Sequence, residues 1–157
     1  MPRTALHAGS TPHFIWPLRV YWEDTDAGGV VFYANYLRYF ERARTEWLRA
    51  LGLAQQALRN EQRLMFVVAD LQLRYLAPAR LDDQLQIGVQ LVERSRVRLV
   101  LAQTAWLDGR PLCAARVTVA CVDADRLVPR AMPAALQAVL PQPGAAVAPA
   151  APAVTPA

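Results

Sequence analysis

The most informative part of the chain is residues 20–52, which read VYWEDTDAGGVVFYANYLRYFERARTEWLRALG. From residue 36 onward, apolar side chains recur with a period of about 3.6 residues, which predicts an amphipathic helix. Asn35 stands where a helix N-cap is expected, and Gly52 follows the last periodic residue as a C-terminal stop. The expected apolar face consists of Tyr36, Leu37, Phe40, Ala43, Trp47, Leu48 and Leu51.

Around this helix the apolar pattern alternates every two residues, as in β-strands. The predicted elements are strands over residues 16–22, 64–76, 85–91, 97–101 and 112–122, and a short helical turn over residues 55–60. Asp108-Gly109 is a hairpin signal. One helix followed by consecutive strands indicates an α+β fold in which a long antiparallel sheet wraps around the central helix. A doubly wound fold is disfavoured, because no dinucleotide glycine motif or Walker loop is present.

The composition suits a single domain, expected over residues 14–140, because 54% of the 157 residues are hydrophobic. Residues 1–13 are expected to form a flexible leader, and residues 141–157, rich in Pro and Ala, a disordered tail. No apolar run reaches the roughly 18 residues of a membrane span, and no signal peptide is recognisable. We therefore expect a cytoplasmic protein.

Charge and cysteine usage narrow the functional classes further. The net charge is +4, and the arginines that carry the positive charge form no basic stripe, which argues against a nucleic-acid partner. Cys113 and Cys121 fall in one predicted strand, about 26 Å apart, so they are predicted to be buried thiols without a disulfide. The two histidines, His7 and His13, lie in the predicted leader, so neither a metal site nor a histidine-based triad is expected.

Three acidic residues, Glu23, Asp24 and Asp26, lie just before the glycine turn and the helix start. A carboxylate facing the free amides of a helix N-terminus is suited to hydrolysis. By spacing alone, however, acidic residues before a helix are more often caps or solvated turn residues. The pattern leaves both interpretations open.

Six short runs together connect the chain to a known family: DTDAGGVV at 24–31, ANYL at 34–37, FERAR at 40–44, FVV at 66–68, YLAPARLDD at 75–83 and CVD at 121–123. With them, about residues 16–133 resemble the hotdog-fold thioesterases of the 4-hydroxybenzoyl-CoA type, and most closely the Tol-Pal system-associated acyl-CoA thioesterase branch. The resemblance implies a hotdog domain that forms a homodimer or homotetramer with active sites at subunit interfaces.

The resemblance further implies an enzyme that hydrolyses an acyl-CoA thioester to a free acid and coenzyme A, with no metal and no cofactor. Asp26, the second aspartate of the Asp-Xaa-Asp motif, is the implied general base or nucleophile. The thioester oxygen would point at the helix-start amide near Tyr33. Gly28 and Gly29 would allow close substrate approach, with a simple turn as the alternative. Many members of the branch have His where this chain has Tyr33, so a histidine base cannot act here, and the Tyr33 hydroxyl is at most auxiliary.

Further residues are candidates for substrate binding. Phe66 and Val67 are expected to line the acyl pocket, with simple core packing as the alternative. Arg94 and Arg96, together with Arg98, are expected on one side of a strand. There the resemblance implies a clamp for the phosphates of coenzyme A, with a solvated face as the alternative.

Two charged residues of the predicted helix, Glu41 and Arg44, are expected to have ionic or hydrogen-bonding partners. Glu41 lies on the polar face and is expected in ion pairs along the helix. Arg44 falls on the apolar face, so a partner is expected for it, such as a carboxylate across a subunit interface.

A second functional class remains open beside the enzyme: a hotdog module that binds acyl carrier protein or the Tol-Pal envelope machinery and has little turnover. A hotdog dehydratase is disfavoured, because it needs an Asp/His pair and no histidine follows His13.

Overall fold

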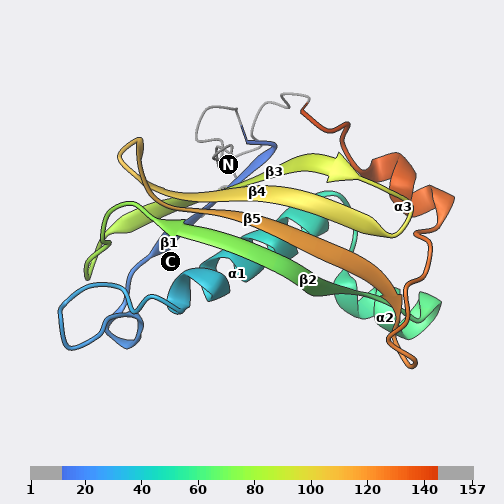
Figure 1. Cartoon of the computed structure of the whole chain (residues 1–157), viewed down its shortest axis with the longest axis horizontal. Helices are drawn as coiled ribbons and strands as arrows, with labels where there is room; N and C mark the ends of the chain where they lie inside the picture. The colour runs from blue at the N-terminus through green and yellow to red at the C-terminus, as the bar shows by residue number, and fades with distance from the viewer. Residues whose placement is uncertain (1–11, 145–157) are drawn as a thin grey trace, which may run out of the picture.

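The computed structural model describes residues 12–144, so the predictions for residues 1–11 and 145–157 lie outside the described residues. The elements, in chain order, are β1 (Phe14–Arg19), a 3-10 turn η1 (Trp22–Asp24), α1 (Asn35–Ala50), α2 (Gln55–Gln62), β2 (Leu64–Tyr75), β3 (Gln84–Arg94), β4 (Arg98–Leu107), β5 (Arg110–Asp123) and α3 (Ala134–Val139). Figure 1 shows the five strands as one long curved sheet with α1 lying against it.

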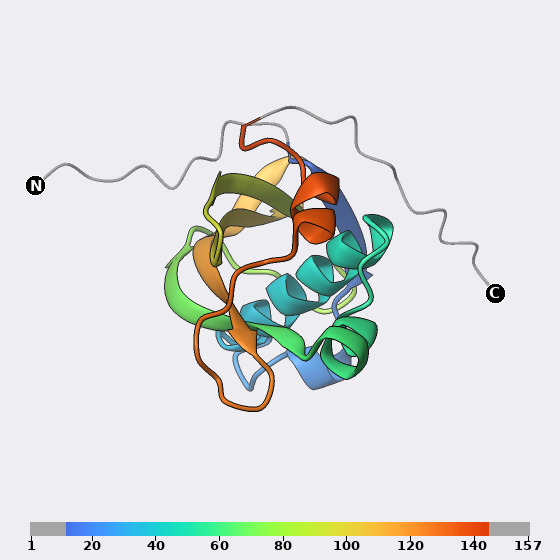
Figure 2. The ribbon, with the colours of Figure 1, turned by 90° about the vertical axis from the view of Figure 1, so that its right-hand side faces the viewer.

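The sheet has the strand order β1-β3-β4-β5-β2, and every neighbouring pair is antiparallel. The predicted hairpin joins β4 to β5, and Asp108 and Gly109 both have the positive φ that this turn requires. Seen end-on, the sheet curls around α1, which occupies its concave side (Figure 2). The predicted α+β fold, an antiparallel sheet wrapped around a central helix, is confirmed.

The helix α1 packs on the sheet through a face slightly rotated from the predicted one. Its buried apolar side chains are Tyr36, Tyr39, Phe40, Ala43, Trp47 and Leu48. Leu37, predicted on this face, is exposed, and Tyr39 is buried in its place. The N-cap is Ala34 rather than Asn35, because Asn35 is the first helical residue and its side chain turns inward to another partner. The predicted stop is Gly52, which has a φ of +82°.

The predicted domain boundaries need correction at both ends of the described chain. His13, assigned to the flexible leader, is buried, and its Nδ1 accepts a hydrogen bond from the Leu91 amide. Gly144, assigned to the tail, donates its amide to the Leu91 carbonyl. Both contacts tie the neighbouring segments to β3, so the packed domain extends beyond residues 14–140.

Local details also differ from the predicted strands. β1 ends at Arg19 because Val20 exchanges backbone hydrogen bonds with Asp82 and Asp83 instead of continuing the strand. The short helix α3 was not predicted. Cys113 and Cys121 are both on β5, buried and free, as predicted.

No helix between residues 12 and 144 is long and apolar enough to cross a membrane.

Candidate active site

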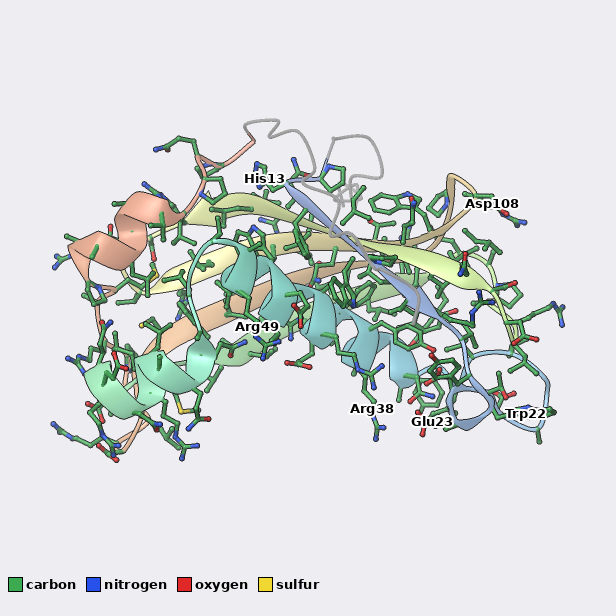
Figure 3. All side chains as sticks on the ribbon, turned by 180° about the vertical axis from the view of Figure 1, so that it is seen from behind. His13, Trp22, Glu23, Arg38, Arg49 and Asp108 are labelled. Atoms are coloured by element: carbon green, nitrogen blue, oxygen red, sulfur yellow. The ribbon has the colours of Figure 1, made fainter. Side chains whose placement is uncertain are left out.

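The acidic loop lies between β1 and α1, at the N-terminal end of the helix. Figure 3 shows Trp22 and Glu23 on this loop, with Arg38 and Arg49 along α1. Asp24 is buried and holds the loop together: its Oδ2 accepts the Tyr21 amide at 2.8 Å. The Asp24 carbonyl accepts the Asn35 side-chain amide at 2.8 Å and the Phe32 amide at 2.9 Å. Through these bonds Asp24 attaches the loop to the first turn of α1.

The pKa of Tyr39, which lies near Asp24, reflects the burial of this region. Burial raises the pKa of the Tyr39 hydroxyl, and the nearby Asp24 carboxylate raises that pKa further. The Tyr39 phenol therefore stays neutral beside the buried Asp24 carboxylate at physiological pH.

Asp26 lies on the outer side of the same loop and is exposed. Its amide donates to the Val30 carbonyl at 2.9 Å, and its Oδ1 accepts the Gly28 amide at 2.8 Å. A Cβ added at Gly28 would lie 3.1 Å from Asp26 Oδ1, and Gly29 has a φ of +76°. The two glycines therefore let the loop fold tightly beside the carboxylate. Among residues 12–144, Asp26 Oδ2 has no hydrogen-bond donor, so that oxygen faces solvent.

The start of α1 provides unused hydrogen-bond donors. Its N-cap, Ala34, has no side-chain oxygen that could accept an amide. The Asn35 amide donates to the Phe32 carbonyl, whereas the amides of Tyr33 and Ala34 find no acceptor within residues 12–144. Free amides at a helix N-terminus favour an anionic oxygen.

Tyr75 closes one side of this site. Its hydroxyl donates to the Tyr33 carbonyl at 2.7 Å, and its ring meets the Tyr36 ring edge-on at 5.7 Å. Burial raises the pKa of Tyr75, so this hydroxyl stays protonated as a donor. Beside it opens a hollow of about 300 Å³, lined by Val30, Val31, Tyr33, Tyr36, Tyr75, Leu76, Ala77 and Pro78. The Tyr33 side chain is 64% exposed on its rim.

Sequence reasoning missed the positioning roles of Tyr75 and Asn35. For Asn35 the available signal was a polar side chain at the start of an otherwise apolar helix face. For Tyr75 it was an aromatic residue at the end of an alternating strand, which gives no indication of what it contacts.

Phe66 and Val67 lie at the far end of β2 from this site. Phe66 and Tyr75 are nine positions apart, which is about 30 Å along a strand. Phe66 instead borders a second cavity, of about 190 Å³, between α1, α2 and the sheet. That cavity is lined by Glu41, Arg44, Thr45, Trp47, Leu48, Gln55, Phe66, Val68, Leu99, Leu101 and Val119. One chain alone does not bring Phe66 or Val67 to Asp26.

Arg94 and Arg96 are also remote from Asp26 in one chain, and the prediction that they share a strand face with Arg98 is wrong. β3 ends at Arg94 and β4 begins at Arg98, so the three arginines surround a tight turn. The Ser95 side-chain oxygen accepts the Arg98 amide in that turn. Arg94 donates to the Gln137 and Leu140 carbonyls at the end of α3, whereas the Arg96 side chain is exposed.

Glu41 has a partner other than the one expected, whereas Arg44 has the partner that its place on the helix calls for, within the same chain. Glu41 accepts a hydrogen bond from the Thr45 hydroxyl at 2.7 Å and joins no ion pair in the described part of the chain. Arg44 donates to Gln103 Oε1 at 2.9 Å, so its partner within this chain is an amide and not a carboxylate. Among residues 12–144, no group of three or more His, Cys, Asp or Glu side chains could hold a metal ion.

Comparison with known proteins identifies the class. Residues 20–140 match the model of the thioesterase-like superfamily. Because this match covers most of the chain, the protein belongs to that superfamily, and the family assignment made from the short runs is confirmed.

Individual proteins similar to this chain carry names more specific than that of the superfamily. The acyl-CoA thioesterase YbgC of Haemophilus influenzae is 46% identical over 125 residues, 80% of this chain and 92% of that protein. The acyl-CoA thioester hydrolase YbgC of Escherichia coli O6:H1 is 46% identical over 134 residues, 85% and 99% of the two chains. A solved structure, a probable thioesterase from Bartonella henselae, superimposes with a TM-score of 0.73 at 32% identity, covering 76% of this chain and 98% of that one.

Proposed function

We propose that this protein hydrolyses acyl-CoA thioesters to a free acid and coenzyme A, with Asp26 as general base or nucleophile. The observation that carries the proposal is the junction of loop and helix. There, within residues 12–144, one short loop holds an exposed carboxylate whose Oδ2 accepts no hydrogen bond and the Tyr33 and Ala34 amides, which donate none. Two relatives at 46% identity that carry acyl-CoA thioesterase names support the substrate class.

The chemistry needs only these groups. Asp26 either takes a proton from the attacking water or attacks the thioester carbonyl itself. The carbonyl oxygen becomes negatively charged, and the free amides of Tyr33 and Ala34 stabilise that charge. In the first route the carbon–sulfur bond then breaks, the proton that Asp26 took from water passes to the sulfur of coenzyme A, and the water oxygen remains in the free acid. In the second route the same bond breakage leaves the acyl group as an anhydride on Asp26, coenzyme A takes its proton from solvent, and a water then hydrolyses the anhydride to the free acid and the Asp26 carboxylate. Gly28 holds Asp26 Oδ1, which keeps the second oxygen available for this step.

The proposal includes a homodimer formed through β2, with a tetramer as a further assembly. β2 is an edge strand, and its middle residues, including Val68 and Leu71, are exposed. An unprotected edge is a template for pairing with a second copy. Antiparallel pairing of two β2 strands sets the beginning of one strand beside the end of the other. Phe66 and Val67 of one copy would then lie near Tyr75 of the other and line its acyl pocket.

For coenzyme A itself, we propose that Arg96 contacts the phosphates and that Arg94 positions the turn by its hold on α3. The exposed guanidinium of Arg96 is suited to a phosphate. Arg94 donates from one guanidinium nitrogen to the carbonyls of Gln137 and Leu140, and these bonds fix the turn that contains Arg96. We also place the enzyme in the cytoplasm, where coenzyme A thioesters are available.

The test is steady-state hydrolysis of butyryl-, palmitoyl- and 4-hydroxybenzoyl-CoA, followed by thiol release, with wild type, Asp26→Asn and Asp108→Asn. Asp108 is at the β4–β5 hairpin tip, so Asp108→Asn is a matched control for the loss of one carboxylate. We expect Asp26→Asn to keep its fold by circular dichroism and to lose at least about 10²-fold in kcat. Comparable kcat in the folded variant would overturn the assignment of Asp26.

The second functional class is tested by the same panel. If wild type hydrolyses no coenzyme A thioester, the same acyl groups are offered on acyl carrier protein. Turnover there that needs Asp26 would move the substrate from coenzyme A to the carrier protein. Absence of turnover on both would favour a binding module.

A further inference from the structure

The cavity between α1, α2 and the sheet contains a cation in largely apolar surroundings. Its walls are mainly aliphatic and aromatic side chains, among them Trp47, Phe66 and Leu101. Arg44 projects into it from α1 and is half-buried. An arginine in such a place has lost much of its hydration, and only hydrogen bonds or an anion can replace it.

The protein itself replaces little of that hydration. One hydrogen bond joins Arg44 to Gln103 Oε1, and Gln103 is held in turn by its own donation to the Phe40 carbonyl at 2.9 Å. No carboxylate within residues 12–144 forms an ion pair with Arg44. Burial lowers the pKa of Arg44, and the charge of Glu41 opposes that effect in part. The planar guanidinium therefore has donors left over.

Glu41 borders the same cavity but is engaged elsewhere. Its carboxylate accepts the Thr45 hydroxyl, and Thr45 accepts the Gln55 side-chain amide at 2.9 Å. This chain of three side chains holds Glu41 at the side of the cavity that faces α2. Arg44 is thus the group in the cavity wall that can receive an anion.

We propose that this cavity takes the far end of the acyl group and that Arg44 selects acyl groups that end in a carboxylate. The inference rests on the proposed function, including the β2-paired dimer that would set the cavity of one copy beside Asp26 of the other. The apolar walls suit a run of methylenes. A terminal carboxylate would accept two parallel hydrogen bonds from the guanidinium, in place of the missing protein anion.

The test compares acyl chains of equal length that differ only at the far end: glutaryl-, adipoyl- and suberoyl-CoA against pentanoyl-, hexanoyl- and octanoyl-CoA. The readout is the ratio of kcat/KM within each pair. We expect wild type to prefer the carboxylate-ended member of at least one pair by about tenfold or more. Arg44→Met should remove that preference while leaving the methyl-ended substrate within about threefold. Arg38→Met, at an exposed position on the same helix, is the control and should match wild type.

A second variant keeps the proposal falsifiable if Arg44→Met does not fold. Glu41→Gln changes an exposed residue and removes a neighbouring negative charge, so it should raise the preference for carboxylate-ended substrates. Wild type that hydrolyses methyl-ended substrates equally well or better in every pair would overturn the role of Arg44 and leave the proposed function standing. Wild type with no turnover on any thioester would overturn the proposed function, and this inference with it.

Discussion

The Tyr75 hydroxyl, at the end of β2, donates a 2.7 Å hydrogen bond to the backbone carbonyl of Tyr33, on the loop before α1. These two residues are 42 positions apart in the sequence. The Tyr33 carbonyl and the Ala34 amide belong to the same peptide group, so the bond fixes one of the two amides that find no acceptor within residues 12–144. The sheet edge thereby positions the predicted oxyanion site, and the same edge is where a second copy would pair.

Tyr75→Phe should lower kcat several-fold while leaving KM close to that of wild type, because the substrate still binds but the Tyr33 peptide is less well held. The free energy of unfolding should fall by about 0.5–1.5 kcal/mol for the lost hydrogen bond. Steady-state kinetics and urea denaturation measure both. Tyr21→Phe, which removes an exposed hydroxyl on the same loop, is the control. Equal kinetics for the two variants would remove Tyr75 from the site.

Gly28→Ala tests whether the room beside Asp26 matters. A Cβ would stand 3.1 Å from Asp26 Oδ1, so the carboxylate must rotate or the turn must open. We expect kcat to fall about tenfold or more with a stability change below about 1 kcal/mol, since the position is exposed. The control is Ala27→Ser on the adjacent residue. Unchanged kcat in Gly28→Ala would mean that the orientation of Asp26 Oδ1 is not limiting.

Leu71→Glu tests the β2-paired dimer. Leu71 is 39% exposed at the middle of the edge strand, and a two-fold axis there would bring two added carboxylates together. We expect light scattering after size exclusion to show a smaller oligomer than wild type, and turnover to be lost with it. Leu127→Glu adds the same charge at a residue that is 62% exposed on the loop after β5, and should keep the wild-type mass. An unchanged mass for Leu71→Glu would contradict pairing at β2.

Burial of Cys113 predicts that the protein loses stability against unfolding at alkaline pH. Burial raises the pKa of the Cys113 thiol from 9.0 to about 12. Below pH 9 the thiol is protonated in both the folded and the unfolded state, so its titration does not lower the free energy of unfolding. Between pH 9 and 12 the unfolded chain loses this proton while the folded chain keeps it, which favours unfolding. From pH 8 to pH 10 the contribution of Cys113 to the free energy of unfolding falls by about 1.4 kcal/mol.

The measurement is urea denaturation of wild type and Cys113→Ala at both pH values. The variant will be less stable at pH 8 because of the cavity it creates. Its further loss on going to pH 10 should nevertheless be smaller than that of wild type. A parallel loss in the two proteins would show that Cys113 does not titrate in this way.

The local elements of the fold follow from the sequence alone, since their periods are local properties of the chain. The apolar repeat from residue 36 placed α1 to within one residue at each end, and the alternation after residue 64 placed β2 just as closely. Asp108 and Gly109 marked their hairpin because few residues tolerate a positive φ. The short motifs indicated the family for a different reason, because together they span most of the domain.

Other features depend on which strands become neighbours, and no local pattern encodes that. The order β1-β3-β4-β5-β2 leaves β2 at an edge, where a second copy can pair with it. The same order sets Gln103 of β4 under α1, where it meets Arg44. Arg94 was predicted to face coenzyme A, but it binds the end of α3, a helix too short to be visible in the sequence.

The sequence by itself therefore determined α1, the strands and the loop on which Asp26 stands, since each depends on residues close together in the chain. It indicated the superfamily through motifs spread along the domain. Tertiary structure alone decided which groups surround that loop: Tyr75 on Tyr33, Asn35 on Asp24, and Gln103 rather than a carboxylate on Arg44. These contacts join residues 11 to 59 positions apart, and they form only when the packing of α1 against the sheet and its edge brings them together.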